Sequence, residues 1–276
     1  MNSNVNEKHK SSVFCTLFSN PDVLRELYSA IEGIDIPPDT PIEINTLSNV
    51  LIKGKLNDVS FLIDNRLVVL IEHQSTINDN MPFRMFLYAS GIYQKLINMK
   101  QMYKQKMIKI PMPEFIVLYN GIDPYPEHKE LRLSDAFINI DDLKKSKNGD
   151  FPLELIVHVY NINKGNNSRI LNKSETLCNY SVFIEKIKEY RSYLPLDESV
   201  KSAIKYCISN NVLGKFLEEN SSEVLNMIFE EWDWDIAKEV WQEEAHEQGL
   251  SQGREQVLEL MEQGLSVEEI KQRLVS

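Results

Sequence analysis

The sequence predicts an α/β core followed by an all-helical C-terminal region. Up to about residue 165, apolar runs of strand length alternate with amphipathic helical segments. Beyond that point, apolar residues recur at helical spacing to the end of the chain. With 276 residues, 42% of them hydrophobic, the chain can bury a sizeable core. The predicted organisation is a core at residues 1–165, a helical region at 166–245 and a short acidic helical tail at 246–276.

The early elements carry clear boundary signals. SNPDVLRELYSAIEG opens with Asn-Pro and repeats apolar residues at helical spacing, so we expect a helix that ends near Gly33. Residues 42–74 read as strands. NMPFRMFLYASGIYQKLINM predicts a helix opened by Asn80 and Pro82, with one apolar face formed by Met85, Ala89, Ile92 and Leu96.

Two more strands complete the predicted core. PEFIVLYNG is a continuous apolar run closed by Asn-Gly, which is typical of a buried strand and its turn. LELIVHVYNIN reads as another strand. Strands that alternate with helices point to an α/β core.

Charge and composition limit the function classes. The net charge is −11, which argues against a nucleic-acid coat protein. Residues 231–276 contain 12 acidic and 4 basic residues, so most of the excess lies in the tail and the core is nearly neutral. The apolar runs are far shorter than the ~20 residues of a membrane helix, and the polar N-terminus is unlike a secretion signal. The three cysteines form no disulfide or zinc pattern. We expect a cytoplasmic protein that does not contact membranes.

The stretch LNDVSFLIDNRLVVLIEHQST, residues 56–76, reads as a β-hairpin with polar residues at its open end. Its central Asp-Asn is a typical turn. If the turn is centred on Asn65, Asp58 lies directly opposite Glu72, and a register shift of one residue leaves the two as diagonal neighbours. Because side chains alternate along a strand, we expect Asp58, Glu72 and Gln74 to share one face.

Two opposed carboxylates in this hairpin would have side-chain roots roughly 5 Å apart and would repel each other. A proton on one acid, an intervening basic side chain or a divalent cation would relieve the repulsion. Mg²⁺ favours carboxylates, waters and a substrate phosphate, and it supports phosphodiester hydrolysis. The pattern therefore favours metal-dependent hydrolysis of a nucleic-acid backbone. The alternative is a structural ion network in which Lys55 or Arg84 pairs with the acids.

A longer run, LNDVSFLIDNRLVVLIEHQSTINDNMPFRMFLYASGIYQKL, resembles the Rpn family of recombination-promoting nucleases and transposases, a branch of the PD-(D/E)XK nuclease superfamily. The resemblance extends to IPMPEFIVLYNG and YPEHKELRLSDAF, and FCTLFSNPDVLRELYSAI is similar to that family's opening helix. In all it covers roughly residues 11–165. It implies a PD-(D/E)XK nuclease-like core, with a mixed central sheet flanked by helices and Mg²⁺ at the active site, or Mn²⁺ in its place.

The resemblance also implies catalytic roles. The motif aspartate falls on Asp58 and the (D/E)XK motif on residues 72–74. Asp58 and Glu72 would hold the metal, and Gln74 would position the attacking water or the phosphate. Most of the superfamily has lysine where this chain has Gln74. Glutamine contributes no charge, so the rate of catalysis is left open.

Other polar residues are predicted to bind the metal or the DNA at the same site. Members of the superfamily often add an acid from the first helix, for which Glu26 is the first candidate metal ligand and Glu43 the second. Arg84 lies one turn into the helix after the motif, and Lys95 shares its face. We expect Arg84, Lys95 and Lys55 to contact the DNA backbone.

Tyr88 and the lysine-rich stretch after it can each be interpreted as structural or as functional. Tyr88 shares the face of Arg84, and we interpret it as a packing residue. The stretch from Lys95 to Lys109 has five lysines and no acids, which suits a phosphate-binding stripe, although charge runs are usually solvated faces.

We therefore expect a Mg²⁺-dependent DNA endonuclease linked to recombination or transposition, with DNA as substrate and self-association through the helical C-terminal region. One alternative is a catalytically weak or inactive nuclease fold that binds DNA or protein, and Gln74 is the residue that favours it. Another is that the helical tail is the functional part and recruits a partner, while the core is structural.

Overall fold

The structure is a computed structural model that describes residues 12–44, 58–64, 66–74, 77–138, 152–229 and 260. It describes the backbone alone of Asp58, Leu67, residues 69–74 and Met99. The chain divides into two compact units, Met1–Met227 and Ile228–Ser276. All described strands belong to the first unit. The further division of this unit at residue 165 stays a prediction.

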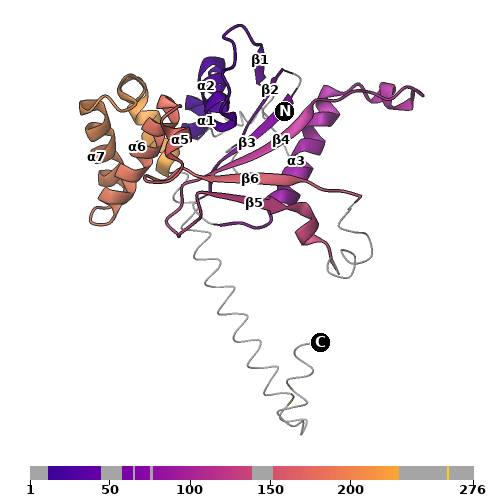
Figure 1. Cartoon of the computed structure of the whole chain (residues 1–276). Coiled ribbons are helices and arrows are strands. Elements are labelled where there is room, and N and C mark those ends of the chain that lie inside the picture. The colour runs from indigo at the N-terminus through magenta and orange to yellow at the C-terminus, as the bar shows by residue number, and fades with distance from the viewer. Residues whose placement is uncertain are drawn as a thin grey trace, which may run out of the picture. The chain divides into compact units, whose positions relative to one another are not determined.

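A six-stranded mixed sheet forms the centre of the first unit, in the order β1-β2-β3-β4-β6-β5 (Figure 1). The pairs β1/β2, β2/β3 and β5/β6 are antiparallel, and β3/β4 and β4/β6 are parallel. The predicted mixed α/β sheet is therefore confirmed. Its strands are β1 (Ile42–Ile44), β2 (Asp58–Ile63), β3 (Arg66–Gln74), β4 (Met112–Tyr119), β5 (His128–Arg132) and β6 (Ile156–Asn161).

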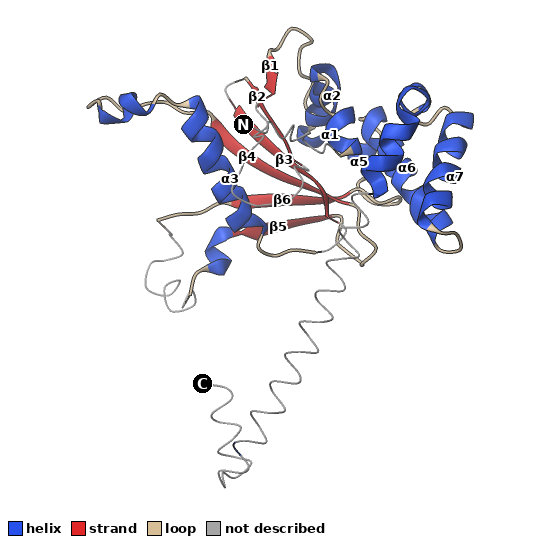
Figure 2. Cartoon of the chain, turned by 180° about the vertical axis from the view of Figure 1, so that it is seen from behind, coloured by secondary structure: helices blue, strands red, loops and turns tan. Residues whose placement is uncertain are grey.

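Helix α3 (Met81–Leu96) covers one face of the sheet, as Figure 2 shows from behind. Its first turn contains Pro82, and the predicted apolar face is correct: Met85, Ala89 and Ile92 are buried, and Leu96 packs at the margin. The opposing strand residues alternate along β4 and β6, as the period of two requires. They are Phe115, Val117 and Tyr119 of β4 and Val157 and Val159 of β6.

The opposite face is covered near β1 and β2 by α2 (Pro21–Glu32), which follows the short α1 (Val13–Leu17). The Asn20 side chain caps α2, and Gly33 ends the helix with φ of 74°, a left-handed conformation that suits glycine. The Tyr28 ring packs edge-on against Phe61 of β2, with centroids 6.1 Å apart. The helix predicted from SNPDVLRELYSAIEG is therefore confirmed with both ends.

The described part of the C-terminal region is helical, as predicted. It contains α5 (Ser168–Leu171), α6 (Glu175–Arg191), α7 (Leu196–Ser209) and further helical residues at 214–229. Helix α6 contacts the core directly, because Ser181 Oγ donates a 2.6 Å hydrogen bond to the carbonyl oxygen of Ile162 and the Tyr180 ring meets Phe14 of α1. Short 3-10 segments, η1 (Met99–Tyr103) and η2 (Leu133–Ala136), connect other elements. Among the described residues no helix is long and apolar enough to cross a lipid bilayer.

Candidate functional site

The β2–β3 hairpin pairs Asp58 with Ile71, so the expectation that Asp58 lies directly opposite Glu72 is wrong by one residue. The pairing continues to Ile63 opposite Arg66, which leaves a turn of only two residues between the strands. Asp64 in this turn has φ of 45°, as tight two-residue hairpins require. The centre of a two-residue turn lies between its two residues rather than on Asn65. Each residue of β2 therefore pairs with a residue of β3 one position earlier than expected.

The motif segment also interrupts the regular ladder between β3 and β4. Ile71 lies opposite Val117, whereas Gln74 lies opposite Tyr119, so three steps along β3 match two along β4. An extra residue of this kind re-aims the side chains around it, and such irregularities are common next to active sites. The strict alternation used to group Asp58, Glu72 and Gln74 therefore does not run through the motif. Their side chains lie outside the described atoms, and the shared face stays a prediction.

The backbone nevertheless places the motif at one end of the sheet. Strands β3, β4 and β6 are parallel, and Gln74, Tyr119 and Asn161 form a row across their carboxyl ends. Asp58 begins β2 at the same end, because β2 runs antiparallel to β3. In open α/β sheets, ligands bind outside the carboxyl ends of the parallel strands. This end of the sheet is therefore the candidate functional site.

Asn120 directly follows β4 at this end and is 2% exposed. Among the described residues, neither its Oδ1 nor its Nδ2 has a hydrogen-bonding partner. Buried amides are ordinarily paired, so a group of this kind needs an explanation such as a bound ligand or ion. Sequence reasoning treated Asn120-Gly121 only as a turn, and no local signal distinguishes such an asparagine from a turn residue.

The adjoining loop is held by Lys188 of α6. Its ammonium donates hydrogen bonds to the carbonyl oxygens of Asn120 and Gly121, the second at 3.4 Å, and to Asn163 Oδ1 at 3.2 Å. Burial lowers the pKa of Lys188 to about 8, so at neutral pH the amine is still largely protonated and able to donate to all three acceptors. The helical region therefore supplies a cation beside the motif end of the sheet.

The sequence contained one signal for Lys188 that was missed. The residue lies four positions after Ile184 and seven after Ser181, both of which are buried in α6. A lysine at that spacing falls on the buried stripe of the helix rather than on its solvated face. Such a lysine needs polar partners, which here come from the loop after β4.

Glu26 lies on α2, and its Oε1 accepts a 3.2 Å hydrogen bond from the backbone amide of Thr176. Thr176 is in the first turn of α6, where amides lack partners within the helix and favour a carboxylate. Glu26 therefore links α2 to the helical region. Its predicted metal role stays a prediction. Glu43, the second candidate, lies on β1 opposite Leu62.

The predicted DNA-contacting residues are only partly described. Arg84 is half-buried on α3, with Nη1 3.6 Å from Met81 Sδ, and Lys95 is exposed in the last turn of the same helix. Lys55 lies outside the described residues. Tyr88 is 6% exposed within the core between α3 and the sheet, so its interpretation as a packing residue is confirmed.

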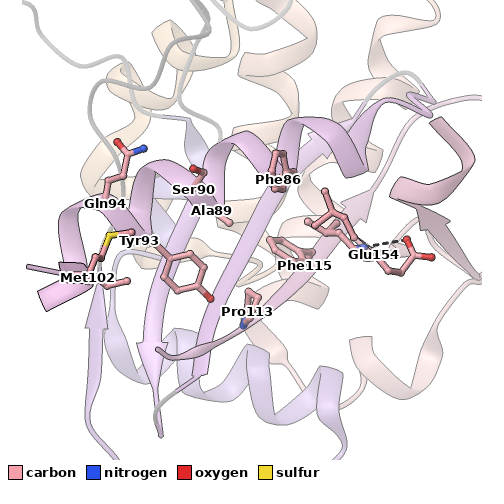
Figure 3. Close-up of a pocket in the computed structure, with 12 residues that line it drawn as sticks. Phe86, Ala89, Ser90, Tyr93, Gln94, Met102, Pro113, Phe115 and Glu154 are labelled. Atoms are coloured by element: carbon pink, nitrogen blue, oxygen red, sulfur yellow. Dashed lines mark hydrogen bonds between the residues drawn. The ribbon is translucent and has the colours of Figure 1, made fainter. Parts of the chain in front are cut away.

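A pocket of about 470 Å³ lies at the other end of β4, between α3, η1 and residues 153–155 (Figure 3). Its walls are mainly apolar and include Phe86, Tyr93 and Phe115. Glu154 is the charged residue of the lining, and its carboxylate accepts hydrogen bonds from the amide and hydroxyl of Ser134. The pocket therefore offers no acid–base pair of its own.

No group of three or more His, Cys, Asp or Glu side chains among those the structure describes is arranged to hold a metal ion. The side chains of Asp58 and Glu72 are not among these. Carboxylate and amide oxygens are nevertheless the donors that Mg²⁺ prefers. Asp58, Glu72 and the unpartnered Asn120 Oδ1 therefore fit a hard divalent cation by their chemistry.

The comparisons with known proteins point to one family. A family model described as "Putative transposase, YhgA-like" matches residues 51–178. No curated protein and no solved structure matches. The matched segment includes the hairpin, α3, β4, β5 and β6, and it leaves out Glu26 and Lys188. Residues 51–178 of this chain are therefore similar to the YhgA-like transposase family, and the predicted resemblance is confirmed over that segment.

Proposed function

We propose that this protein is a Mg²⁺-dependent nuclease that hydrolyses DNA phosphodiester bonds during recombination or transposition. The observation that carries the proposal is the family match, which spans Asp58, Glu72 and Gln74 in one continuous segment. The position of these residues at the carboxyl end of parallel strands supports it. The interruption of the ladder between Ile71 and Gln74 supports it further, since it falls within the motif.

The roles of the residues follow from their chemistry. Asp58 and Glu72 would hold the metal through their carboxylates, with Glu26 as a third acid. Bound Mg²⁺ would supply activation of a water and stabilisation of charge on the leaving oxygen. Gln74 would orient the water or contact the phosphate through its amide, without adding charge. Arg84, Lys55 and Lys95 would neutralise backbone phosphates on either side.

Conversion of supercoiled plasmid to nicked and linear forms tests the proposal. The wild-type protein should cleave with Mg²⁺ or Mn²⁺ and not with excess chelator. Asp58→Asn and Glu72→Gln should each reduce the rate by at least about 100-fold, because each removes a charged ligand while keeping its shape. Thermal unfolding of both variants should stay near that of the wild type.

A matched control comes from acids outside the site. Asp197 is an exposed acid on α7, paired with Lys201 at 3.3 Å, and Asp197→Asn should leave cleavage unchanged. Absence of cleavage by folded wild-type protein with every divalent metal tried would reject the nuclease. DNA binding without cleavage would then favour the second candidate, an inactive nuclease fold, for which Gln74 is the motivating residue.

A further inference from the structure

Residues 97–112, termed here the lysine arm, leave the end of α3, project away from it and return as the start of β4 (Figure 1). The root of the arm is fixed. Tyr93 Oη donates a 2.6 Å hydrogen bond to the carbonyl oxygen of Pro111, and Asn98 caps η1 by accepting from the amide of Lys100 at 3.0 Å. Met102 lies over the apolar pocket beneath (Figure 3). The arm is therefore a projecting element with an anchored base.

Apolar side chains of the lysine arm are unusually exposed. Tyr103 is 90% exposed and Met107 79%, and Met102, Ile110 and Met112 are each at least half exposed. Isolated exposed apolar residues are ordinary, but several on one short segment indicate an interaction surface. A lysine-rich surface that only contacts solvent would not be expected to carry these exposed apolar side chains.

The charge on the lysine arm has one sign. It contains Lys100, Lys104, Lys106 and Lys109 and no acid. Within the described residues none of these four lysines forms an ion pair. In a chain with a net charge of −11, this concentration of unpaired positive charge is suited to a polyanion.

We infer that the lysine arm is a second DNA-binding element, in which its four lysines contact backbone phosphates and Tyr103 and Met107 contact bases or the groove. Contacts between lysines and phosphates contribute much of the affinity for DNA. Aromatic side chains stack on bases, and methionine can wedge between them. An acidic protein surface would satisfy the lysines as well. The inference rests on the proposed function for the choice of DNA.

The arm and the motif lie at opposite ends of the sheet, which predicts how much DNA is needed. The arm enters β4 at Met112, and Gln74 lies opposite Tyr119 at the far end. Seven steps along a strand cover about 23 Å. At 3.4 Å per base pair, this corresponds to about 7 base pairs of duplex. Contacts by the arm should therefore begin about 7 base pairs or more from the scissile bond.

The test measures affinity for a fluorescent 24-base-pair duplex across a series of salt concentrations, in chelator so that cleavage cannot occur. In the variant Lys100→Ala/Lys104→Ala/Lys106→Ala/Lys109→Ala, the slope of log affinity against log salt should fall by about 3 to 4, at ~0.9 per phosphate contact. Tyr103→Ala should weaken binding about 10-fold with the slope unchanged, because it removes stacking and no charge.

A charge-matched control uses four exposed lysines elsewhere, Lys173, Lys201, Lys205 and Lys215. Their combined replacement by Ala removes the same charge, and the slope should change by less than about 1. An equal loss in both variants, or an unchanged slope in the arm variant, would overturn the inference.

The two proposals fail in different ways. If wild-type protein never cleaves DNA but binds it with an arm-dependent slope, the arm stands and the nuclease falls. If plasmid cleavage is normal while the arm variant keeps the wild-type slope, the nuclease stands and the arm falls. A wild-type protein that does not bind DNA at all overturns the arm inference.

Discussion

Lys188 of α6 donates a hydrogen bond to the carbonyl oxygen of Asn120, the residue that follows β4. The two residues are 68 positions apart in the chain, and one of them adjoins the motif end of the sheet. The contact joins the helical region to the loop beside Gln74. It makes the geometry of the candidate site dependent on a helix that the family model covers only at its start.

Replacing Lys188 by Met should lower the free energy of unfolding by about 1–3 kcal/mol, because buried carbonyl acceptors lose a charged donor. Urea unfolding measures the change. Lys201→Met on α7 is the control, since its exposed pair with Asp197 should contribute well under about 1 kcal/mol. Equal stability of the two variants would show that the contacts of Lys188 are not important.

Glu26 variants can separate a capping role from a metal role. Glu26→Gln keeps an oxygen that accepts from the Thr176 amide, whereas Glu26→Ala removes it. We expect Glu26→Ala to lose about 1 kcal/mol of stability and Glu26→Gln less. If Glu26 is also a metal ligand, Glu26→Gln should raise the Mg²⁺ concentration for half-maximal cleavage at least about 10-fold. Unchanged Mg²⁺ dependence would restrict Glu26 to capping.

Substituting Gln74 by Lys should raise the rate of plasmid cleavage, by about 10-fold, because it adds a positive charge where the phosphate is proposed to lie. Gln74→Leu should lower the rate, since it removes the amide. The measurement is the initial rate at saturating Mg²⁺. A Gln74→Lys variant that folds normally but cleaves no faster would place the residue away from the reacting phosphate.

The paired histidines His128 and His158 predict a pH dependence of stability. Their Nε2 and Nδ1 atoms lie 3.2 Å apart, and burial together with the charge of His158 lowers the pKa of His128 below 6.5, against a smaller opposing effect of Glu130. Because the unfolded chain then binds the proton more tightly, stability should fall as the pH drops below about 6.5. Urea unfolding between pH 5 and 8 tests this, and His128→Gln should reduce the slope.

Local signals predicted the elements well. Asn20, Pro21 and Gly33 fix α2 through backbone preferences that act within a few residues. The apolar face of α3 follows from helical spacing, and the burial of FIVLY in β4 follows from its unbroken apolar run. Each of these features depends on residues close together in the sequence, so it can be predicted without knowledge of the fold.

The site was less predictable because its geometry is non-local. The register of Asp58 depends on whether the turn at Asp64 is centred on a residue or between two. The interruption between Ile71 and Gln74 depends on how β3 meets β4, whose paired residues lie 45 to 46 positions further along the chain. The contact of Lys188 with Asn120 depends on the docking of α6. None of these can be inferred from the residues of the hairpin alone.

Strand β5 has a consequence for assembly. It borders the described sheet, and its sequence HKELR has Leu131 as the single aliphatic residue among titratable ones. A border of this composition discourages another chain from adding a strand there. Lateral growth of a continuous sheet between two copies is therefore disfavoured along β5. Self-association at this edge would therefore depend on side-chain contacts, which makes it sensitive to individual substitutions.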